Sequence, residues 1–289
     1  MRSVQVVATT AGVGRLDAGV VSVLDAPFPH AGAVIEQTGS LETLRTCAVR
    51  EQLPLEDCSL LMPLGRPRAI WGVGLNYRSK AELTGRAVPT EPILYLSAAS
   101  STVAREPVAV PADQTLELDY EAEIALVIGH RLYRAAPDDV WPAVAALTAA
   151  NDLSARDVMR STGSPTLAKS FPGCNPLGMS LSTVDEVADR DRIRVRSWVN
   201  GELRQDDTSA GLIFSVPELI ARLSHYAALE PGDVVLTGTP AGTGQDRHCF
   251  LVPGDQVRVE VESVLPLETS VVAPADDGCP PVRDGVLHA

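Results

Sequence analysis

Three acidic residues alternate along one stretch of the sequence, where they could bind a cation. Asp119, Glu121 and Glu123 occupy every second position before the apolar run 124–128. Residues two apart on a β-strand point to the same face, so these carboxylates would crowd one side of the strand. Like charges beside a buried run are costly unless a cation compensates them. The spacing therefore indicates cation binding, with a solvated strand face as the ordinary alternative.

Asp152 makes a metal site the better interpretation of these acids. It follows the apolar run 145–150, which places another carboxylate at the end of a second buried element. No histidine stands near, so Glu121, Glu123 and Asp152 would offer only oxygen ligands. Hard cations such as Mg²⁺, Mn²⁺ and Ca²⁺ prefer oxygen, whereas zinc favours nitrogen and sulfur. We therefore predict that these three residues hold a hard divalent cation.

Two glycine-containing stretches could also take part in binding. Gly72 and Gly74 follow a strand-like segment, but Tyr77 stands where a dinucleotide-binding motif would carry its third glycine. We therefore reject a dinucleotide site there. The stretch T-G-T-P-A-G-T-G, residues 237–244, is either a tight turn or a loop whose backbone N–H groups hold an anionic oxygen. Both interpretations stay open.

The composition favours a small molecule as the ligand. The chain has 289 residues, of which 45% are hydrophobic and 21% are charged, as in ordinary soluble globular proteins. Its formal net charge of -13 would repel nucleic acids and anionic membranes, so neither is expected as a partner. The apolar runs are strand-sized and too short to span a bilayer.

The chain is expected to work in the cytoplasm. Its N-terminal stretch lacks the sustained apolar segment and small-residue cleavage site of a signal peptide. The five cysteines form an odd number without C-x-x-C spacing, so reduced thiols are expected.

The pattern of elements predicts a mixed α/β, β-rich fold with few helices. Residues 1–65 read as a small N-terminal subdomain with strands at 4–8 and 20–24 and one short helix after Ser40. Residues 66–271 would form the main domain, and residues 272–289, rich in proline, glycine and aspartate, a surface tail.

Several local signals place elements within the main domain. Alternating residues 193–199 followed by Asn200-Gly201 predict a strand and a type I′ hairpin turn, and residues 257–261 alternate in the same way. Ser215 and Glu218 form a capping box at the start of a helix. A second helix is expected over residues 138–146.

Five motifs occur in order along the chain: G-L-N-Y at 74–77, D-Y-E-A-E-I at 119–124, N-D-L-S-A-R-D at 151–157, A-K-S-F at 168–171, and a block from V-N-G at 199–201 through L-T-G-T-P-A-G at 236–242. Together they resemble the fumarylacetoacetate hydrolase family over about residues 55–270, in its branch of bacterial 2-hydroxyhepta-2,4-diene-1,7-dioate isomerases and acylpyruvate hydrolases.

The resemblance implies a core built around a rolled mixed β-sheet and a homodimeric assembly. It also implies Mg²⁺ (or Mn²⁺) held by Glu121, Glu123 and Asp152, the residues that the acidic pattern had already indicated. Members of this family act on 2-oxo acids or β-diketones, and the metal stabilises an enolate. A small 2-oxo acid or diketone is therefore the expected substrate.

The resemblance also suggests roles for residues outside the acidic trio. Lys169 matches a family lysine that balances charge beside the metal, and Thr239 matches a threonine that lines the pocket. Asn76, Tyr77 and Gly238 lie in matching motifs and are predicted, with Thr239, to bind substrate. Arg156 and Asp157 match too, and a structural ion pair is the role expected of them.

The sequence departs from the family pattern where hydrolytic members carry a histidine and a glutamate that activate water. Lys80 stands in place of the histidine and Leu83 in place of the glutamate. Ser97 and Met159 replace a lysine and a glutamine, which suggests a less basic pocket and a substrate less anionic than a dicarboxylate. A lysine near its usual pKa of about 10 is a poor base.

Three interpretations follow. The first is a metal-dependent enzyme that uses an enolate for decarboxylation, tautomerisation, dehydration or cyclisation, with Lys80 and Lys169 as catalytic residues. The second is a C–C bond hydrolase of the acylpyruvate or fumarylacetoacetate type. The third is a catalytically silent family member that binds a metal or a metabolite.

Overall fold

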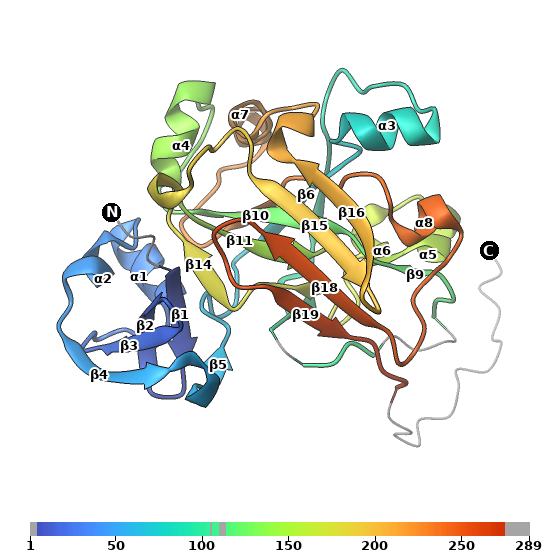
Figure 1. The fold of residues 1–289 in the computed structure, drawn as a ribbon. Coiled ribbons are helices and arrows are strands. Elements are labelled where there is room, and N and C mark those ends of the chain that lie inside the picture. Colours follow the sequence, from blue (N-terminus) through green and yellow to red (C-terminus); the bar gives the residue numbers. More distant parts are fainter. Residues whose placement is uncertain (1–4, 105, 110–113, 275–289) are drawn as a thin grey trace, which may run out of the picture.

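One large, mainly antiparallel sheet forms the framework of the computed structural model, which describes residues 5–104, 106–109 and 114–274 (Figure 1). Its strands follow the order β4-β3-β2-β1-β14-β11-β10-β17-β6-β7, with β5 beside β1. They are β1 (Gln5–Thr9), β2 (Gly12–Asp17), β3 (Val20–Leu24), β4 (Val49–Pro54), β5 (Leu60–Leu61), β6 (Ile70–Gly74), β7 (Ile93–Ser97), β10 (Ala122–Ile128), β11 (Val144–Asn151), β14 (Ser180–Ser182) and β17 (Val234–Leu236).

A second sheet of four strands has the order β16-β15-β18-β19, and two short ladders pair β12 with β9 and β13 with β8. These strands are β8 (Thr102–Val103), β9 (Leu118–Asp119), β12 (Ser154–Ala155), β13 (Asn175–Pro176), β15 (Arg194–Val199), β16 (Glu202–Thr208), β18 (Gln256–Val261) and β19 (Leu267–Ser270).

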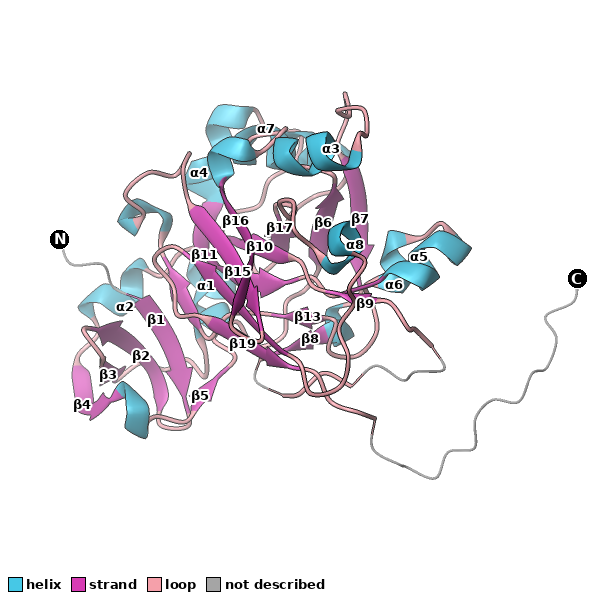
Figure 2. Ribbon diagram, turned by 45° about the vertical axis from the view of Figure 1, so that its right-hand side comes forward, coloured by secondary structure: helices cyan, strands magenta, loops and turns pink. Residues whose placement is uncertain are grey.

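The helices are short and lie around the sheets (Figure 2). They are α1 (Ala31–Thr38), α2 (Glu42–Thr46), α3 (Arg78–Thr84), α4 (Val140–Ala143), α5 (Arg156–Thr162), α6 (Pro165–Ala168), α7 (Val216–Tyr226) and α8 (Gly244–Arg247). The predicted mixed α/β, β-rich fold with few helices is confirmed.

The antiparallel pair β10 and β11 lies at the centre of the core. The four-stranded sheet packs across both strands (Figures 1 and 2). Along β10, Ile124, Leu126 and Ile128 belong to one buried cluster and Ala125 and Val127 to another. Burial on both faces explains why this segment is continuously apolar instead of alternating.

The N-terminal strands continue the large sheet, since β1 pairs with β14 in antiparallel register. Side chains also join the two regions: the guanidinium group of Arg45 donates to Thr183 over 3.0 Å and to Asp185 over 2.9 Å. The predicted tail, residues 272–289, falls largely outside the described residues.

Most of the local sequence signals are confirmed. Asn200 and Gly201 both have positive φ, 51° and 81°, as a type I′ turn between β15 and β16 requires. The strand predicted at residues 257–261 lies within β18, and the helix after Ser40 is α2.

The helix predicted over residues 138–146 is wrong in its second half. Its α-helical part, α4, ends at Ala143, and Val144 begins strand β11. Val144 pairs with Ile128 of β10 and Ala146 with Val127, so tertiary pairing overrides the local pattern. Helices α1, α3, α5, α6 and α8 were not predicted.

Among the described residues, no helix is both long enough and apolar enough to cross a membrane. Cys47, Cys58, Cys174 and Cys249 are free thiols, as expected, and Cys279 lies outside the described residues.

The capping box at the start of α7 generates a prediction about stability. The hydroxyl of Ser215 accepts from the backbone N–H of Glu218, and the Glu218 carboxylate accepts from the N–H of Ser215 over 2.9 Å. Ser215→Ala should lower the free energy of unfolding by about 1 kcal/mol, because it leaves a helix N–H without its partner. Urea denaturation measures this change. Ser161→Ala on the exposed side of α5 is the control and should change the free energy of unfolding little, since that hydroxyl only bonds back to its own helix.

Candidate metal centre

The three predicted ligands meet where β10 begins and β11 ends. Glu121 and Glu123 flank the first residue of β10, and Asp152 follows the last residue of β11. The antiparallel register pairs Ala122 with Asn151, which brings these two strand ends together. One carboxylate oxygen from each of the three acids lies within 4.8 Å of the others, and all three residues are buried.

Two of these carboxylates each present one oxygen without a hydrogen-bond partner. Glu123 accepts the backbone N–H of Gly238 at Oε2, over 2.6 Å, and its Oε1 has no partner. Asp152 accepts Lys169 at Oδ2, over 2.5 Å, and its Oδ1 has no partner. Buried carboxylate oxygens left without a donor are costly. A hard cation would satisfy both, so the geometry fits Mg²⁺ or Mn²⁺.

Two buried cations hold the third carboxylate, that of Glu121. Lys169 donates to Oε2 of Glu121 over 2.6 Å, and Arg156 donates to Oε1 of the same carboxylate. Arg156 also donates to Oδ2 of Asp119 over 2.8 Å. Asp119 is not one of the three clustered carboxylates, and the cation that compensates it is Arg156. The structural ion pair expected of Arg156 is formed with Glu121 and Asp119, while Asp157 accepts from Thr115 and the N–H of Leu116 instead.

The surroundings shift the pKa values of the three carboxyl groups in different directions. Burial would raise the pKa of Glu121, but Arg156 and Lys169 outweigh it and lower that pKa to about 2. Burial, followed by the charges of Asp152 and Glu121, raises the pKa of Glu123 well above its usual range. Burial also raises the pKa of Asp152, although Lys169 offsets part of the effect. A divalent ion would remove the repulsion that disfavours the ionised forms.

The charges of the surrounding cluster match a divalent ion. Salt bridges join Asp119, Glu121 and Asp152 to Arg156 and Lys169, and Glu123 lies against Glu121 and Asp152. These four carboxylates and two cations leave two negative charges in excess when all are ionised. The ion pair of Lys80 with Asp246 is separate and does not change this balance.

Lys80 lies on α3 and is held in an ion pair. Its Nζ donates to both carboxylate oxygens of Asp246 and to the hydroxyl of Thr243, each over 2.7 Å. The side chains of Lys80 and Asp246 are only 10% and 1% exposed. The ammonium is thus held by Asp246 and Thr243. Leu83, at the position of the family glutamate, is 60% exposed.

Among the residues predicted to bind substrate, Asn76 and Thr239 bond to the protein backbone through their side chains, whereas Tyr77 does not within the part of the chain that the structure describes. The amide of Asn76 bonds to the backbone of Phe214 and Thr237. The hydroxyl of Thr239 donates to the carbonyl of Ala122 over 3.0 Å. Tyr77 is buried, and its hydroxyl is without a partner among the described residues.

The glycine-rich loop at 237–244 binds carboxylates of the protein itself. Gly238 has φ +94°, a conformation that favours glycine, and there its N–H reaches Glu123. Further along, the N–H groups of Gly244 and Gln245 donate to Asp119, over 2.5 and 3.1 Å. The anionic oxygens that this loop holds are therefore carboxylate oxygens beside the candidate centre.

Two residues that the sequence analysis did not single out, Tyr95 and Asp246, contribute to this site. Tyr95 on β7 donates its hydroxyl to Oδ2 of Asp152. Asp246 is the partner of Lys80, and as an ordinary acid in sequence it is revealed only by that partner. Asp119, one of the alternating acids, anchors the N-terminus of α8. One feature of the sequence could have pointed to Tyr95: it lies in a strand, two residues before Ser97.

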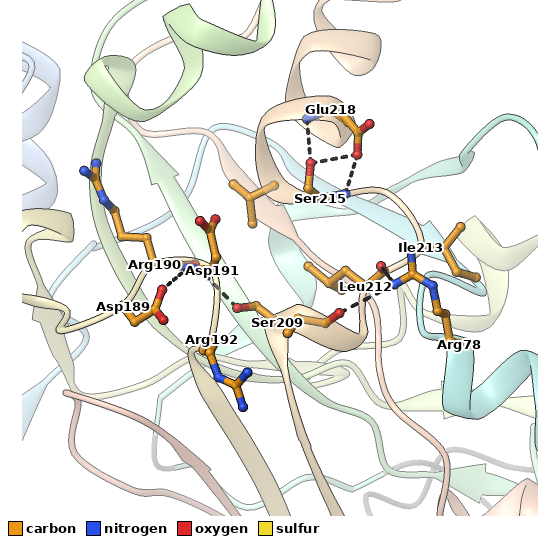
Figure 3. A pocket seen from close by; sticks show the side chains of 12 residues that line it. Arg78, Asp189, Arg190, Asp191, Arg192, Ser209, Leu212, Ile213, Ser215 and Glu218 are labelled. Carbon is orange, nitrogen blue, oxygen red and sulfur yellow. Dashed lines mark hydrogen bonds between the residues drawn. The ribbon is translucent and has the colours of Figure 1, made fainter.

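A separate hollow of about 420 Å³ lies between α3, the start of α7 and residues 189–192 (Figure 3). None of the residues that line it belongs to the acidic cluster. Arg78 reaches from α3 to the carbonyl of Leu212, and the charges of residues 189–192 are exposed. We therefore place the candidate site at the buried carboxylates.

Known proteins resemble this chain in both sequence and fold. Residues 69–272 match the fumarylacetoacetate (FAA) hydrolase C-terminal family. The human mitochondrial oxaloacetate tautomerase FAHD2A is 37% identical over 241 residues, which cover 82% of this chain and 77% of the human protein.

Two solved structures share the fold. A fumarylacetoacetate hydrolase from Exiguobacterium antarcticum aligns with a TM-score of 0.83 and 28% identity, over 95% of this chain and 100% of the other. A 2-hydroxyhepta-2,4-diene-1,7-dioate isomerase from Mycobacterium marinum aligns with a TM-score of 0.76 and 25% identity, over the same shares of the two chains.

Glu123→Gln tests whether the carboxylates form a metal site. In the metal-free protein, the raised pKa of Glu123 means that the folded state holds the proton of this carboxyl more tightly than the unfolded state does. The protein therefore loses stability as the pH rises from the usual pKa range of glutamate toward the folded-state pKa of Glu123. Neutral glutamine removes this penalty, and its carbonyl can still accept from Gly238. The metal-free variant should therefore melt at or above the temperature of the metal-free parent near neutral pH.

The same variant should lose its response to metal. Mn²⁺ at 100 times its dissociation constant should stabilise the parent by about 2.7 kcal/mol, whereas Glu123→Gln should gain much less. Thermal melts with and without Mn²⁺ measure both effects. Glu82→Gln, an exposed charge removal on α3, is the control and should respond as the parent does. A parent whose melting temperature ignores Mn²⁺ and Mg²⁺ would contradict the site.

Proposed function

The chain belongs to the fumarylacetoacetate hydrolase family, and we propose that it is a divalent-metal-dependent enzyme that tautomerises a small 2-oxo acid. The observation that carries the proposal is the pair of buried carboxylate oxygens, Glu123 Oε1 and Asp152 Oδ1, that have no donor. Glu121, Glu123 and Asp152 would hold the ion. The oxaloacetate tautomerase named above supports this reaction class.

Keto–enol tautomerisation suits the groups that this chain provides. The reaction moves one proton between the carbon next to the 2-oxo group and the 2-oxo oxygen, so it breaks no C–C bond and consumes no water. When bound, the ion would polarise the 2-oxo group and stabilise negative charge on its oxygen. Lys169 uses two N–H groups for Glu121 and Asp152, so its third can donate to a substrate oxygen. The free hydroxyl of Tyr77 is a second candidate contact.

Hydrolysis is less well supported, because no residue in the position of the usual dyad can serve as a base. The ion pair with Asp246 holds Lys80 as an ammonium, and an ammonium has no lone pair to accept a proton from water. It also cannot form an imine in this arrangement. We therefore assign Lys80 the role of a fixed cation, and Lys169 the role of the cation that acts on the substrate.

The other parts of the proposal rest on composition and family resemblance. Ser97 is buried at the place of a family lysine, and its hydroxyl has no partner among the described residues. A neutral group there favours a 2-oxo acid with one carboxylate over a dicarboxylate. Action in the cytoplasm and assembly as a homodimer remain predictions.

A tautomerisation assay tests the proposal. Enol consumption, followed by its ultraviolet absorbance, should be accelerated by the Mg²⁺- or Mn²⁺-loaded protein for oxaloacetate or for a monocarboxylate analogue such as an acylpyruvate. Chelator or Asp152→Asn should reduce the rate by at least about 100-fold, the scale of a lost charge-stabilising group. Ser161→Ala serves as the matched surface control.

The alternatives predict other outcomes of the same assay. If oxygen from isotopically labelled water appears in a new product carboxylate, the protein is a hydrolase. If neither substrate changes at any metal concentration, while Mn²⁺ still binds, the protein is a silent member of the family.

Paired substitutions at Lys80 and Asp246 test the role of the ion pair. Each of Lys80→Met and Asp246→Asn leaves a buried charge without its partner and should destabilise the fold by about 3–5 kcal/mol. The double variant removes both charges and should recover much of this loss. If Lys80 acts only through the pair, turnover by the double variant should stay near that of the parent. A fall of about 100-fold or more at recovered stability would instead show that Lys80 transfers a proton.

A further inference from the structure

A cross-strand pair of glycine and tyrosine lies beside the metal centre. Gly72 on β6 pairs directly with Tyr95 on β7. A Cβ atom built on Gly72 would lie 2.2 Å from Cζ and 2.3 Å from the hydroxyl oxygen of Tyr95. Any side chain at position 72 would therefore have to displace the ring. This accounts for the first glycine of the G-V-G stretch, which no binding motif explained.

The ring laid across Gly72 directs its hydroxyl to a metal ligand. Tyr95 is 6% exposed, and its hydroxyl donates to Oδ2 of Asp152. Lys169 donates to the same oxygen over 2.5 Å, and its Nζ lies 5.1 Å from the centre of the Tyr95 ring. Both donors thus hold one side of the carboxylate. The other oxygen, Oδ1, is the one left without a partner.

We infer that Tyr95 is a positioning residue for the metal ligand Asp152, and that Gly72 is required because it makes room for Tyr95. The inference rests on the proposed metal site and adds to it which oxygen of Asp152 meets the ion. With Oδ2 held by two donors, the carboxylate cannot rotate freely, and Oδ1 is the oxygen left for an ion. Hydrogen-bond partners of metal ligands commonly fix ligand orientation in this way.

The chemistry of a phenol suits this position. Arg156 and Lys169 already bring two positive charges to the ligands, and the cluster keeps the two negative charges that a divalent ion would balance. A third cation next to Asp152 would reduce that excess and weaken the attraction for the ion. The hydroxyl of Tyr95 orients the carboxylate without adding charge.

Tyr95→Phe separates positioning from packing, because phenylalanine fills the same space over Gly72 and lacks only the hydroxyl. The measurement is the dissociation constant of Mn²⁺ alone, by calorimetry on the full chain, together with the melting temperature of the metal-free protein. We expect the dissociation constant to rise by about 10-fold or more, the usual effect of losing a partner of a metal ligand.

Tyr120→Phe is the matched control. Tyr120 is also buried, and its hydroxyl donates to a backbone carbonyl, that of Gly242, over 2.8 Å. It should lower the melting temperature without changing Mn²⁺ affinity. If Tyr95→Phe behaves like this control, with an Mn²⁺ dissociation constant within twofold of the parent's, Tyr95 only packs and the inference is wrong. If the parent itself binds no Mn²⁺, the proposed function fails as well.

Gly72→Ala provides an independent arm. The added methyl group should push the ring away from Asp152 and weaken Mn²⁺ binding in the parent. In the Tyr95→Phe background it should cause no further loss, because the hydrogen bond is already absent. Equal losses in both backgrounds would mean that Gly72 affects the site by another route and would overturn the link between Gly72 and Tyr95.

Discussion

The need to compensate buried negative charge constrains this whole region of the molecule. Carboxylates that lose their contact with water must gain donors or cations, or their ionised forms become unfavourable. Here Arg156 and Lys169 serve Glu121, and the N–H of Gly238 serves one oxygen of Glu123. Among the described residues of the acidic cluster, two negative charges and two carboxylate oxygens remain without a partner. A divalent ion with oxygen ligands would satisfy both.

The fold meets this constraint by placing irregular backbone at the ends of its most buried strands. Because β10 and β11 run antiparallel, the start of one and the end of the other bring together carboxylates from segments that are separate in sequence. The loop after β17 adds N–H donors, and β7 adds the hydroxyl of Tyr95. The two buried apolar strands behind them hold the three carboxylates close together before any ion binds.

The departure at Lys80 changes the charge network as well as the chemistry. In place of a group that could activate water, the chain has an ammonium bound to Asp246 and Thr243. Asp246 in turn accepts N–H groups from Gly242 and Thr243, so the ion pair also fixes the loop that anchors Asp119. An enzyme that only moves a proton within its substrate needs no base to activate water. The position of such a base can then hold an ion pair that stabilises the loop.

The sequence by itself determined the elements with strong local causes and singled out the three carboxylates that the structure brings together. The turn at Asn200, the capping box at Ser215 and the buried run of β10 follow from residue types alone, and the alternating acids indicated a cation. Only the tertiary structure decided which acid belongs to which cation, because that depends on segments that are distant in sequence. The fold pairs Asp119 with Arg156 and Asp246 with Lys80, and it brings the hydroxyl of Tyr95 to Asp152. Pairing with β10 makes residues 144–146 part of a strand.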